Sequence, residues 1–298
     1  MNKHLLSRYT SYLSSKGEKF SVVDGSIYRR YNNMIVPFGS ITEDYSISNH
    51  HARELLNQLG GILIRSTNGN LSTNQNKDWY AVVCDDFVSI DELRSKLKIK
   101  GEIKRGLTNC EVKRIDPVYL SEKGFEIYSN ALQAYKSVKI STSTREQFIQ
   151  DSLCAQHYED IVHYWGAFHK NELIAYCSNF LYDNVEVSYS TMKFNPKYLS
   201  LYPSYALFYE MNKYYLSENK IKFANAGFRS ILHETSIQSY LTKKFNFKKM
   251  YLDLNIYYSP IFKFIISAIY PFRNSIGRID KRLSAIMELE KIRRNSNE

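Results

Sequence analysis

The sequence predicts a mixed α/β fold, and three observations support that prediction. Short apolar runs suited to buried strands alternate with segments whose apolar residues recur at helical spacing. Only 12 Gly and 6 Pro occur in 298 residues, which favours regular elements over long irregular loops. The composition, with 44% hydrophobic and 23% charged residues, is that of a folded chain, and its length allows two domains of ordinary size.

In the first half of the chain, strand-like and helix-like segments alternate. Gly60-Gly61 ends one predicted helix, and Ser89 forms a capping box with Glu92 before another. The expected elements are a strand-turn-strand unit at 21–39, a helix at 48–59, strands at 62–67 and 79–87, a helix after Ser89, and a strand at 110–116.

The second half contains a strand meander between helices. Hairpin turns are expected at 169–171 and at Asp183-Asn184, Pro203 suits a first helical position, and Asn246 can end a helix in the left-handed conformation. The expected elements are helices at 117–135 and 144–153, strands at 164–170, 172–183 and 184–194, a helix at 203–219, a strand at 221–227, a helix opened by the capping pair Thr235 and Gln238, a strand at 250–258, and a basic helical tail from Pro260.

Several functional classes are disfavoured by the sequence. No metal site is expected, because the histidines at 157, 163 and 169 recur every six residues, which suits neither helical ligation nor a compact zinc loop. No nucleophile elbow, Walker loop or dinucleotide fingerprint occurs. The four cysteines form no CxxC pair, so neither a disulfide framework nor a zinc site is expected (Cys84, Cys110, Cys154, Cys177).

The chain is expected to be cytoplasmic. Its first residues, MNKHLLSRYTSYLSSKGEKF, lack the apolar core of a secretory signal. No stretch reaches the roughly 18 apolar residues of a membrane-spanning helix. The longest candidate, 261–272, is too short and contains Lys263.

The net charge of +10 is concentrated in two segments. Residues 94–114 hold eight basic and two acidic residues, a net +6, and residues 273–294 hold seven basic and three acidic residues, a net +4. Such concentrated charge suits a polyanion, which here means cofactor phosphates, RNA or an anionic membrane face. The alternative is a pair of solvated helical faces.

The order of elements in the second half resembles the acyl-CoA N-acyltransferase (GNAT) fold. Four segments are similar to its FemAB-like branch, in which two such domains occur in one chain: WYAVV at 79–83, IKRGLTNCEVKRID at 103–116, WGAFHKNELIAY at 165–176 and GFRSILHETSIQSYLTKKFNF at 227–247. The resemblance implies a degenerate GNAT-like domain at 1–116, a complete donor-binding domain at 117–259 and a basic helical tail at 260–298.

The resemblance implies an acyltransferase that moves an acyl group from a thioester donor, such as acyl-CoA, to an amine or hydroxyl. The expected acceptor is a small or lipid-linked sugar or peptide precursor of the cell surface. Two alternatives stay open: a peptidyl ligase that uses aminoacyl-tRNA, and a double-domain scaffold without activity. One departure bears on the donor, because the segment KYLSLYPSYALFYE at 197–210 contains no glycine where the family has a glycine-containing pyrophosphate loop.

Two residues are candidates for the general base of the transfer. Glu186 lies between Val185 and Val187, which are expected to face the core, so its side chain is expected on the opposite side. The alternative for Glu186 is an exposed strand carboxylate. His233 follows the strand at 221–227 and titrates near neutral pH; its alternative role is to cap or pack the loop.

The donor is expected to bind at the start of the helix that follows Pro203 and in the loop after residue 227. Ser204, Tyr205 and Ala206 occupy the first helical turn, where backbone N–H groups can meet a phosphate or thioester oxygen, unless water caps them. Arg229 offers a bidentate fork to a phosphate or carboxylate. Lys243 lies near the place where FemAB-like relatives often have a basic residue.

The acceptor is expected to contact the basic segment and the aromatic residues near it. Under the resemblance, Lys104 and Arg105 bind an anionic sugar-phosphate, a lipid-linked acceptor or tRNA, and Trp79 stacks on a sugar or base. An aromatic core explains Trp79 equally well. The tail pairs the apolar run at 261–272 with basic residues, which suits either an interfacial helix on the cytoplasmic face of an anionic membrane or a helix that packs on the second domain.

Overall fold

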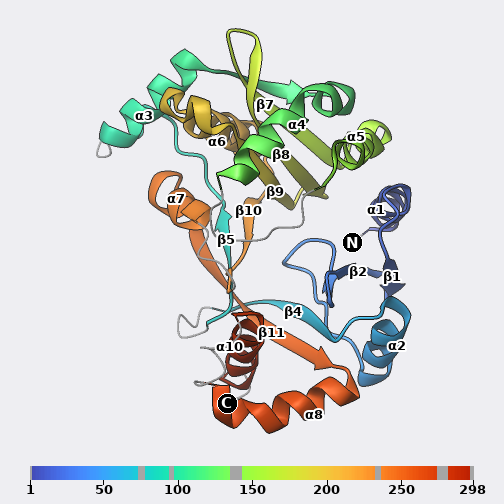
Figure 1. The fold of residues 1–298 in the computed structure, drawn as a ribbon. Helices are drawn as coiled ribbons and strands as arrows, with labels where there is room; N and C mark the ends of the chain where they lie inside the picture. The colour runs from blue at the N-terminus through green and yellow to red at the C-terminus, as the bar shows by residue number, and fades with distance from the viewer. Residues whose placement is uncertain are drawn as a thin grey trace. The chain divides into compact units, whose positions relative to one another are not determined.

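The computed structural model describes residues 2–72, 78–93, 97–134, 143–231, 236–273 and 281–295 (Figure 1). The chain divides into two compact units, and each unit is assembled from separate segments. Unit 1 comprises Met1–Val82, Phe228–Ser239 and Lys249–Glu298, and unit 2 comprises Val83–Gly227 and Tyr240–Lys248.

Unit 1 contains a mixed sheet with the strand order β1-β2-β3-β4-β11-β5. The pairs β1–β2, β2–β3 and β4–β11 are antiparallel, and β3–β4 is parallel. Its elements are α1 (Lys3–Ser15), β1 (Phe20–Val23), β2 (Ser26–Tyr31), β3 (Met34–Pro37), α2 (Asn49–Leu59), β4 (Leu63–Ser72), β5 (Tyr80–Cys84), β11 (Lys248–Tyr258), α8 (Pro260–Ile269), the 3-10 helix η4 (Tyr270–Phe272) and α10 (Lys281–Asn295).

The core of unit 1 forms where α2 covers the sheet. The buried residues of α2 recur at helical spacing and pack on buried strand residues (Ala52, Leu55, Leu56, Leu59; Tyr28, Ile35, Ile64). The predicted bounds of α2 are confirmed, since the Ser48 hydroxyl accepts the His51 N–H at 3.1 Å and Gly60 closes the helix at φ 70°. Helix α1 was not among the expected elements; the Asn2 side chain caps it by accepting the Leu5 N–H at 2.8 Å.

Unit 2 contains the strand order β10-β9-β8-β7-β6, in which only the β10–β9 pair is parallel. The predicted meander, its flanking helices and the last strands are confirmed. The elements are α3 (Leu97–Asn109), β6 (Glu111–Ile115), α4 (Pro117–Gln133), α5 (Arg145–Leu153), the 3-10 helix η1 (Cys154–His157), β7 (Val162–His169), β8 (Glu172–Tyr182), β9 (Glu186–Phe194), the 3-10 helix η2 (Pro196–Leu201), α6 (Pro203–Asn212), the π-helix η3 (Lys213–Glu218), and most of β10 (Phe223–Phe228) and α7 (Ser236–Lys244). Phe228 at the end of β10 and the first residues of α7, up to Ser239, belong to unit 1.

Helices cover both faces of the sheet in unit 2. Successive residues of a strand point to opposite faces. Tyr176 contacts Phe148 of α5, whereas the preceding Ala175 packs in a cluster with Ala206 of α6. The hairpin turns lie where they were predicted, and they use left-handed residues at Lys170, Asn171 and Asp183.

The compact units differ from the expected boundaries at 116 and 259. Residues 83–116 belong to unit 2, because β6 pairs with β7. The tail and β11 belong to unit 1, because β11 pairs with β4 and Tyr258 donates a hydrogen bond to Glu290 of α10 at 2.9 Å. These pairings join segments far apart in the sequence, which a division into consecutive stretches could not represent.

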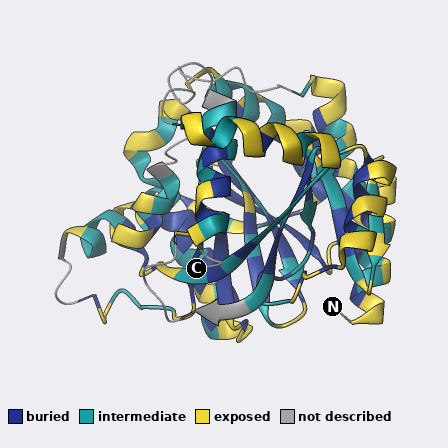
Figure 2. Cartoon of the chain, turned by 90° about the horizontal axis from the view of Figure 1, so that it is seen from below, coloured by how far each residue is buried: buried dark blue, intermediate teal, exposed yellow. Residues whose placement is uncertain are grey.

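Burial follows the secondary structure within each unit. Figure 2 shows strands that are mostly buried and helices whose outer faces are exposed. Within the part of the chain that the structure describes, every helix is too short or too polar to span a membrane.

Candidate functional site

Unit 1 contains a cavity of about 160 Å³ beside the sheet. Its walls come from β3, β4, the loop between β3 and α2, and the residues just before β5 and at the end of β10. The lining includes Ile41, Tyr45, Arg65, Ser66, Trp79 and Phe228. Apolar walls with a few polar groups are typical of small-ligand sites.

Arg65 presents a cation to this cavity beside a pair of stacked aromatic rings. Its guanidinium carbon lies 5.3 Å from the ring centroid of Trp79 and 5.9 Å from that of Phe228. The two rings stack on each other at 5.4 Å with an interplanar angle of 15°. This geometry fixes the guanidinium by cation–π contact.

Arg65 has no anionic partner among the described residues, since none of them forms an ion pair or hydrogen bond with its side chain. Burial lowers the pKa of Arg65 from its usual value, which means that its surroundings stabilise the charge less than water does. An arginine keeps its proton under such conditions. The charge of Arg65 is therefore available to an anion that enters the cavity.

Two further polar atoms of the lining are buried without a partner. The indole Nε1 of Trp79 and the Oγ of Ser66 make no hydrogen bond within the described residues. A buried polar atom without a partner costs about 1–3 kcal/mol, and such atoms are rare in native proteins. The residues that carry these atoms line the same cavity as Arg65, and an N–H donor near a cation suits a phosphate or carboxylate.

Arg229 was predicted to grip the donor, and the structure shows it bonded to protein groups of unit 1. Its Nη1 donates to the Asp78 carbonyl at 2.8 Å, its Nη2 donates to Glu288 at 3.2 Å, and its backbone N–H donates to the Tyr80 carbonyl at 2.8 Å. A donor role for Arg229 stays a prediction. It requires Arg229 to replace these hydrogen bonds to protein groups with hydrogen bonds to the donor. His233 lies outside the described residues.

In unit 2, the predicted phosphate site at the start of α6 is occupied by protein contacts. The backbone N–H groups of Tyr205 and Ala206 donate to the Tyr202 carbonyl at 3.1 and 3.3 Å, and the Ser204 hydroxyl lies 3.1 Å from that of Tyr240. A Cβ placed on Gly106 of α3 would lie 2.7 Å from the Tyr202 carbonyl oxygen. Helix α3 therefore packs directly on this helix start, and a bound phosphate would have to replace these contacts.

Next to this helix start lies a cluster formed by Glu102, Tyr205 and Lys244. The Lys244 ammonium donates to Glu102 at 2.7 Å and lies 5.5 Å from the ring centroid of Tyr205. The hydrogen bond to Glu102 raises the pKa of Lys244. Burial raises the pKa of Glu102, but Lys244 outweighs this effect and holds the pKa of that carboxyl below its usual value. The predicted Lys243 is exposed, so its neighbour Lys244 is the lysine that faces the cluster.

Glu186 is fully buried in unit 2, so the alternative of an exposed strand carboxylate is wrong. Its carboxylate accepts a hydrogen bond from the Asn225 amide at 2.7 Å, across the parallel pair of β9 and β10. That pair joins three residues of each strand, 186–188 and 223–225. A role for Glu186 as general base stays a prediction.

The predicted acceptor cations Lys104 and Arg105 are exposed on α3. Neither forms an ion pair with a carboxylate of the described residues. The Arg105 guanidinium lies 6.0 Å from the ring centroid of Tyr202. Both charges thus face solvent, where they can meet an anionic ligand, but they belong to unit 2, whereas Trp79 belongs to unit 1.

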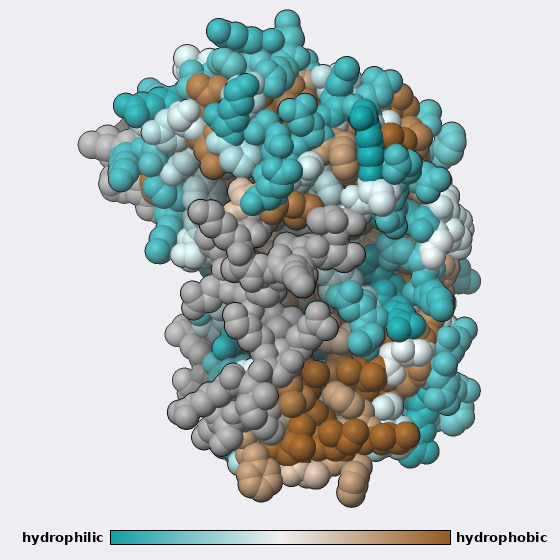
Figure 3. All heavy atoms as spheres, viewed as in Figure 1, coloured by the Kyte–Doolittle hydropathy of each residue, from teal (hydrophilic) through white to brown (hydrophobic). Residues whose placement is uncertain are grey.

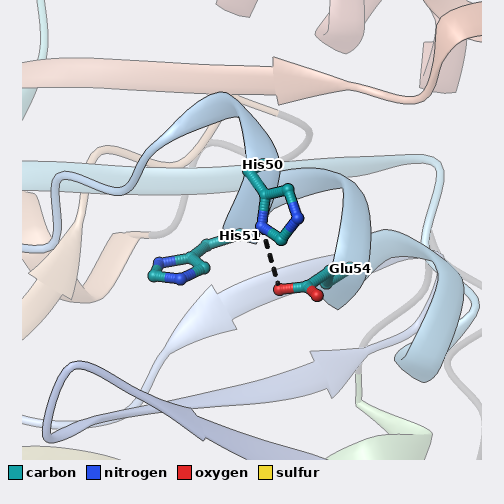
Figure 4. Close-up of side chains that lie close together, drawn as sticks. All are labelled: His50, His51 and Glu54. Carbon is teal, nitrogen blue, oxygen red and sulfur yellow. Dashed lines mark ion pairs between the residues drawn. The ribbon is translucent and has the colours of Figure 1, made fainter.

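Among the described residues, a group of potential metal ligands, two exposed and one half-buried, lies at the first turns of α2. Figure 4 shows His50, His51 and Glu54, whose ligand atoms lie within 4.8 Å of one another. His50 Nδ1 lies 3.4 Å from Glu54, and His51 Nδ1 lies 3.2 Å from Asp24. These exposed ion pairs account for the arrangement as helix-surface contacts.

The sequence interpretation missed Arg65, Ser66 and Phe228. A charged residue within the apolar run ILIRST was a signal for Arg65, since a cation inside a strand of a buried sheet is uncommon. The approach of Phe228 to Trp79 joins residues 149 positions apart in the sequence, and no local pattern marks it.

The chain matches no protein-family model and no curated protein. Its structure is similar to several solved structures. FemX has a TM-score of 0.57 at 8% identity, with 88% of this chain and 93% of that chain covered. The C-terminal domain of a protein assigned as a lysylphosphatidylglycerol synthetase, from Agrobacterium fabrum, has a TM-score of 0.54 at 10% identity, with 90% and 97% covered.

L-PGS from Bacillus licheniformis has a TM-score of 0.50 at 12% identity, with 88% of this chain and 94% of that chain covered. At such low identity these similarities concern the fold alone, and they extend over most of every chain compared. They confirm the expected mixed α/β fold of the GNAT-like, FemAB-like kind.

Proposed function

We propose that the protein is an acyltransferase that moves an acyl group from an activated carrier to an amine or hydroxyl of an anionic cell-surface precursor. The observation that carries this proposal is the cavity of unit 1, where neither the Arg65 charge nor two polar atoms have a partner among the described residues. The cavity holds the anionic group of the acceptor. The fold supports the reaction class by analogy, which is a weaker argument than the site itself.

The chemistry of the acceptor follows from the cavity lining. A phosphate or carboxylate accepts paired hydrogen bonds from a guanidinium, and the same anion accepts from the Trp79 indole N–H. One of the similar structures is assigned as a synthetase of lysylphosphatidylglycerol, a product whose name joins an aminoacyl group to an anionic lipid, and this agrees with an anionic acceptor.

The transfer itself needs a base and an activated donor. The acceptor nitrogen or oxygen forms the new bond to the acyl carbon, the bond to the carrier breaks, and the acceptor proton passes to a base within hydrogen-bond reach. Glu186 and His233 are the proposed bases. A thioester carrier leaves as a thiolate, and the protonated base returns the proton to it to give the thiol.

A second candidate donor, aminoacyl-tRNA, is favoured by two observations in unit 2. Helix α3 covers the start of α6, where a coenzyme pyrophosphate was expected to bind. The same helix exposes Lys104 and Arg105 without acidic partners among the described residues. Exposed cations of this kind suit a nucleic-acid backbone, and their binding weakens steeply as salt concentration rises.

The experiment is a transfer assay that combines acyl-CoAs or aminoacyl-tRNAs with phosphate- or carboxylate-bearing acceptors, with products identified by mass. Arg65→Met is expected to raise the KM of the acceptor by about 10- to 100-fold, the value of a charged hydrogen bond, and to leave the KM of the donor unchanged. Arg53→Met, the same change at an exposed site of unit 1, is the control. Product from aminoacyl-tRNA alone would establish the second donor.

Two outcomes would contradict the proposal. If donors and acceptors bind but no product forms with any pair, the non-catalytic scaffold replaces the transferase. If neither Arg65→Met nor Arg53→Met changes the KM of the acceptor, the cavity does not hold the acceptor.

A further inference from the structure

Helix α8 and the following η4 form an apolar surface on unit 1. Ile261 is 77% exposed, Phe264 76% and Phe272 65%, and Ile265 is exposed as well. These four lie within Pro260–Phe272, and the other exposed large hydrophobic residues of unit 1, among those described, are Val22 and Tyr31. Figure 3 shows this area as a brown patch along the lower edge of the molecule.

Several apolar residues of α8 are not used in the core. Ile266 is its single buried residue among those described. Ile261, Phe264 and Ile265 follow the spacing i, i+3 and i+4, so they line one face of the helix, and Ile266 points to another side. A helix whose apolar face is exposed over this length is rare on a soluble surface, and such patches mark interaction sites.

The charge around this face is positive. Residues 260–273 contain Lys263 and Arg273 and no acidic residue. In the part of α10 that the structure describes, Arg293 and Arg294 both bond to Glu290 at 2.8 Å, so two cations share one carboxylate. The Arg294 guanidinium also lies 3.8 Å from the ring centroid of Tyr270 in η4, which ties the basic helix to the apolar segment.

We propose that α8 and η4 lie in the surface of an anionic lipid bilayer, with Ile261, Phe264 and Phe272 among the acyl chains and Lys263 and Arg273 at the phosphate level. A short helix with an apolar face, aromatic residues and flanking cations is the pattern of an interfacial helix. The helix projects its apolar residues outward rather than lining a groove, and this suits a fluid lipid surface better than the complementary face of a protein.

Charge distinguishes the lipid surface from a second copy of the chain. Two copies that meet through this face would bring Lys263 and Arg273 of each copy close to those of the other, with no acidic residue in the segment to offset them. An anionic bilayer supplies the opposite charge to the same groups. The inference does not depend on the proposed transferase activity, since it concerns a different surface.

The experiment is co-sedimentation of the full chain with vesicles of phosphatidylcholine alone or mixed with phosphatidylglycerol. The protein is expected to sediment with the mixed vesicles and to bind phosphatidylcholine vesicles weakly. Phe264→Asp should weaken binding to mixed vesicles by about tenfold or more, since it removes an exposed aromatic side chain that would enter the lipid and adds a negative charge that anionic lipid repels. Leu199→Asp is the matched control, because Leu199 is a 53% exposed apolar residue of unit 2, and it should bind like the unmodified chain.

Unchanged thermal unfolding of both variants establishes that they fold. The inference is overturned if mixed vesicles do not sediment the protein, or if Phe264→Asp and Leu199→Asp bind equally well. Light scattering supplies a further test: a dimer that Phe264→Asp dissociates, in a protein that binds no vesicles, would assign the face to a second copy of the chain.

Discussion

The two tryptophans of the chain are both buried, one in each unit, and their indole N–H groups meet different surroundings. Trp165 in unit 2 donates to the Tyr215 hydroxyl at 2.8 Å. Trp79 in unit 1 has no partner for its N–H in the part of the chain that the structure describes, and it lines a cavity. A buried donor without a partner is costly, so the contrast separates a side chain that completes a core from one that is arranged for a ligand.

The donors around Trp165 share one acceptor, the Tyr215 hydroxyl, although the Asn179 carbonyl oxygen beside them has no partner among the described residues. The Tyr215 hydroxyl also accepts from the Asn179 amide at 3.3 Å and lies 2.9 Å from His163 Nδ1. Two donors fill the two lone pairs of the hydroxyl, which leaves its hydrogen for His163. His163 must then be unprotonated at Nδ1, which agrees with burial and the nearby Arg114 lowering the pKa of His163 to about 3. The histidine is therefore a neutral part of the core rather than a catalytic base.

Removing the centre of this network tests the contrast with the largest expected effect. Tyr215→Phe would leave the Trp165 N–H, the Asn179 amide and His163 without a shared partner, and we expect it to lower the free energy of unfolding by about 3 kcal/mol. Chemical denaturation measures the change. Tyr214→Phe is the control, because that hydroxyl makes no hydrogen bond with the described residues, and it should cost much less.

A loss of stability by Tyr215→Phe no larger than that by Tyr214→Phe would remove the basis of the comparison. It would mean that water or a rearranged side chain readily satisfies the buried groups of unit 2. In that case the unpaired atoms of unit 1 would also carry less weight as evidence for a ligand.

The second contrast lies between the open cavity of unit 1 and the covered start of α6 in unit 2. In Gly106→Ala, the new Cβ would lie 2.7 Å from the Tyr202 carbonyl oxygen and 3.0 Å from the Ala206 nitrogen, both backbone atoms. We expect a net loss of about 2 kcal/mol, typical of overpacking. Gly101→Ala, in the same helix with nothing within 4 Å, should instead stabilise the protein by about 0.5–1 kcal/mol.

Denaturation curves of these two variants test whether α3 can move away from the start of α6. If Gly106→Ala stabilises the protein as Gly101→Ala does, then α3 separates from α6 at little cost. The helix start would then be accessible to a thioester donor, as the sequence suggested for Ser204, Tyr205 and Ala206.

The sequence predicted most elements of the fold because local signals define them. Turn residues placed the hairpins of the meander, and Ser48 with Gly60 marked both ends of α2. The candidate sites depend on tertiary contacts that such signals do not contain. Lys243 and Lys244 look alike in sequence, yet successive helix positions differ in direction by about 100°, and only the packing of α7 against α3 makes Lys244 the partner of Glu102.

Trp79 shows the same limit in unit 1. Its aromatic character and position justified the prediction that it binds a substrate, but an aromatic core was an equal alternative. The sequence alone could not distinguish the two tryptophans, since both lie in apolar strand-like runs. Only the structure reveals that Trp165 has a hydroxyl beside it and that Trp79 has a cavity, with Arg65 contributed by another strand.

The smallest expected effect tests the cavity most directly. In Ser66→Ala the lost hydroxyl has no partner among the described residues, so we expect the free energy of unfolding to stay the same or to rise by up to about 1 kcal/mol. Ser40→Ala is the matched control in unit 1, because the buried Ser40 hydroxyl lies 2.9 Å from that of Thr42 and accepts the Thr42 N–H at 3.3 Å. That substitution should cost about 1 kcal/mol.

The changes in the free energy of unfolding are expected to have opposite signs in Ser66→Ala and Ser40→Ala. This difference distinguishes a hydroxyl that is reserved for a ligand from one that stabilises the fold. Because a structural serine loses a bond when it is truncated, equal losses in Ser66→Ala and Ser40→Ala, measured by denaturation without ligand, would mean that the Ser66 hydroxyl is already satisfied in the free protein. The Ser66→Ala variant could instead be stable and bind the anionic acceptor more weakly. That result would show that the unpaired Ser66 hydroxyl lowers the stability of unit 1 and contributes to ligand binding, a combination found at functional sites.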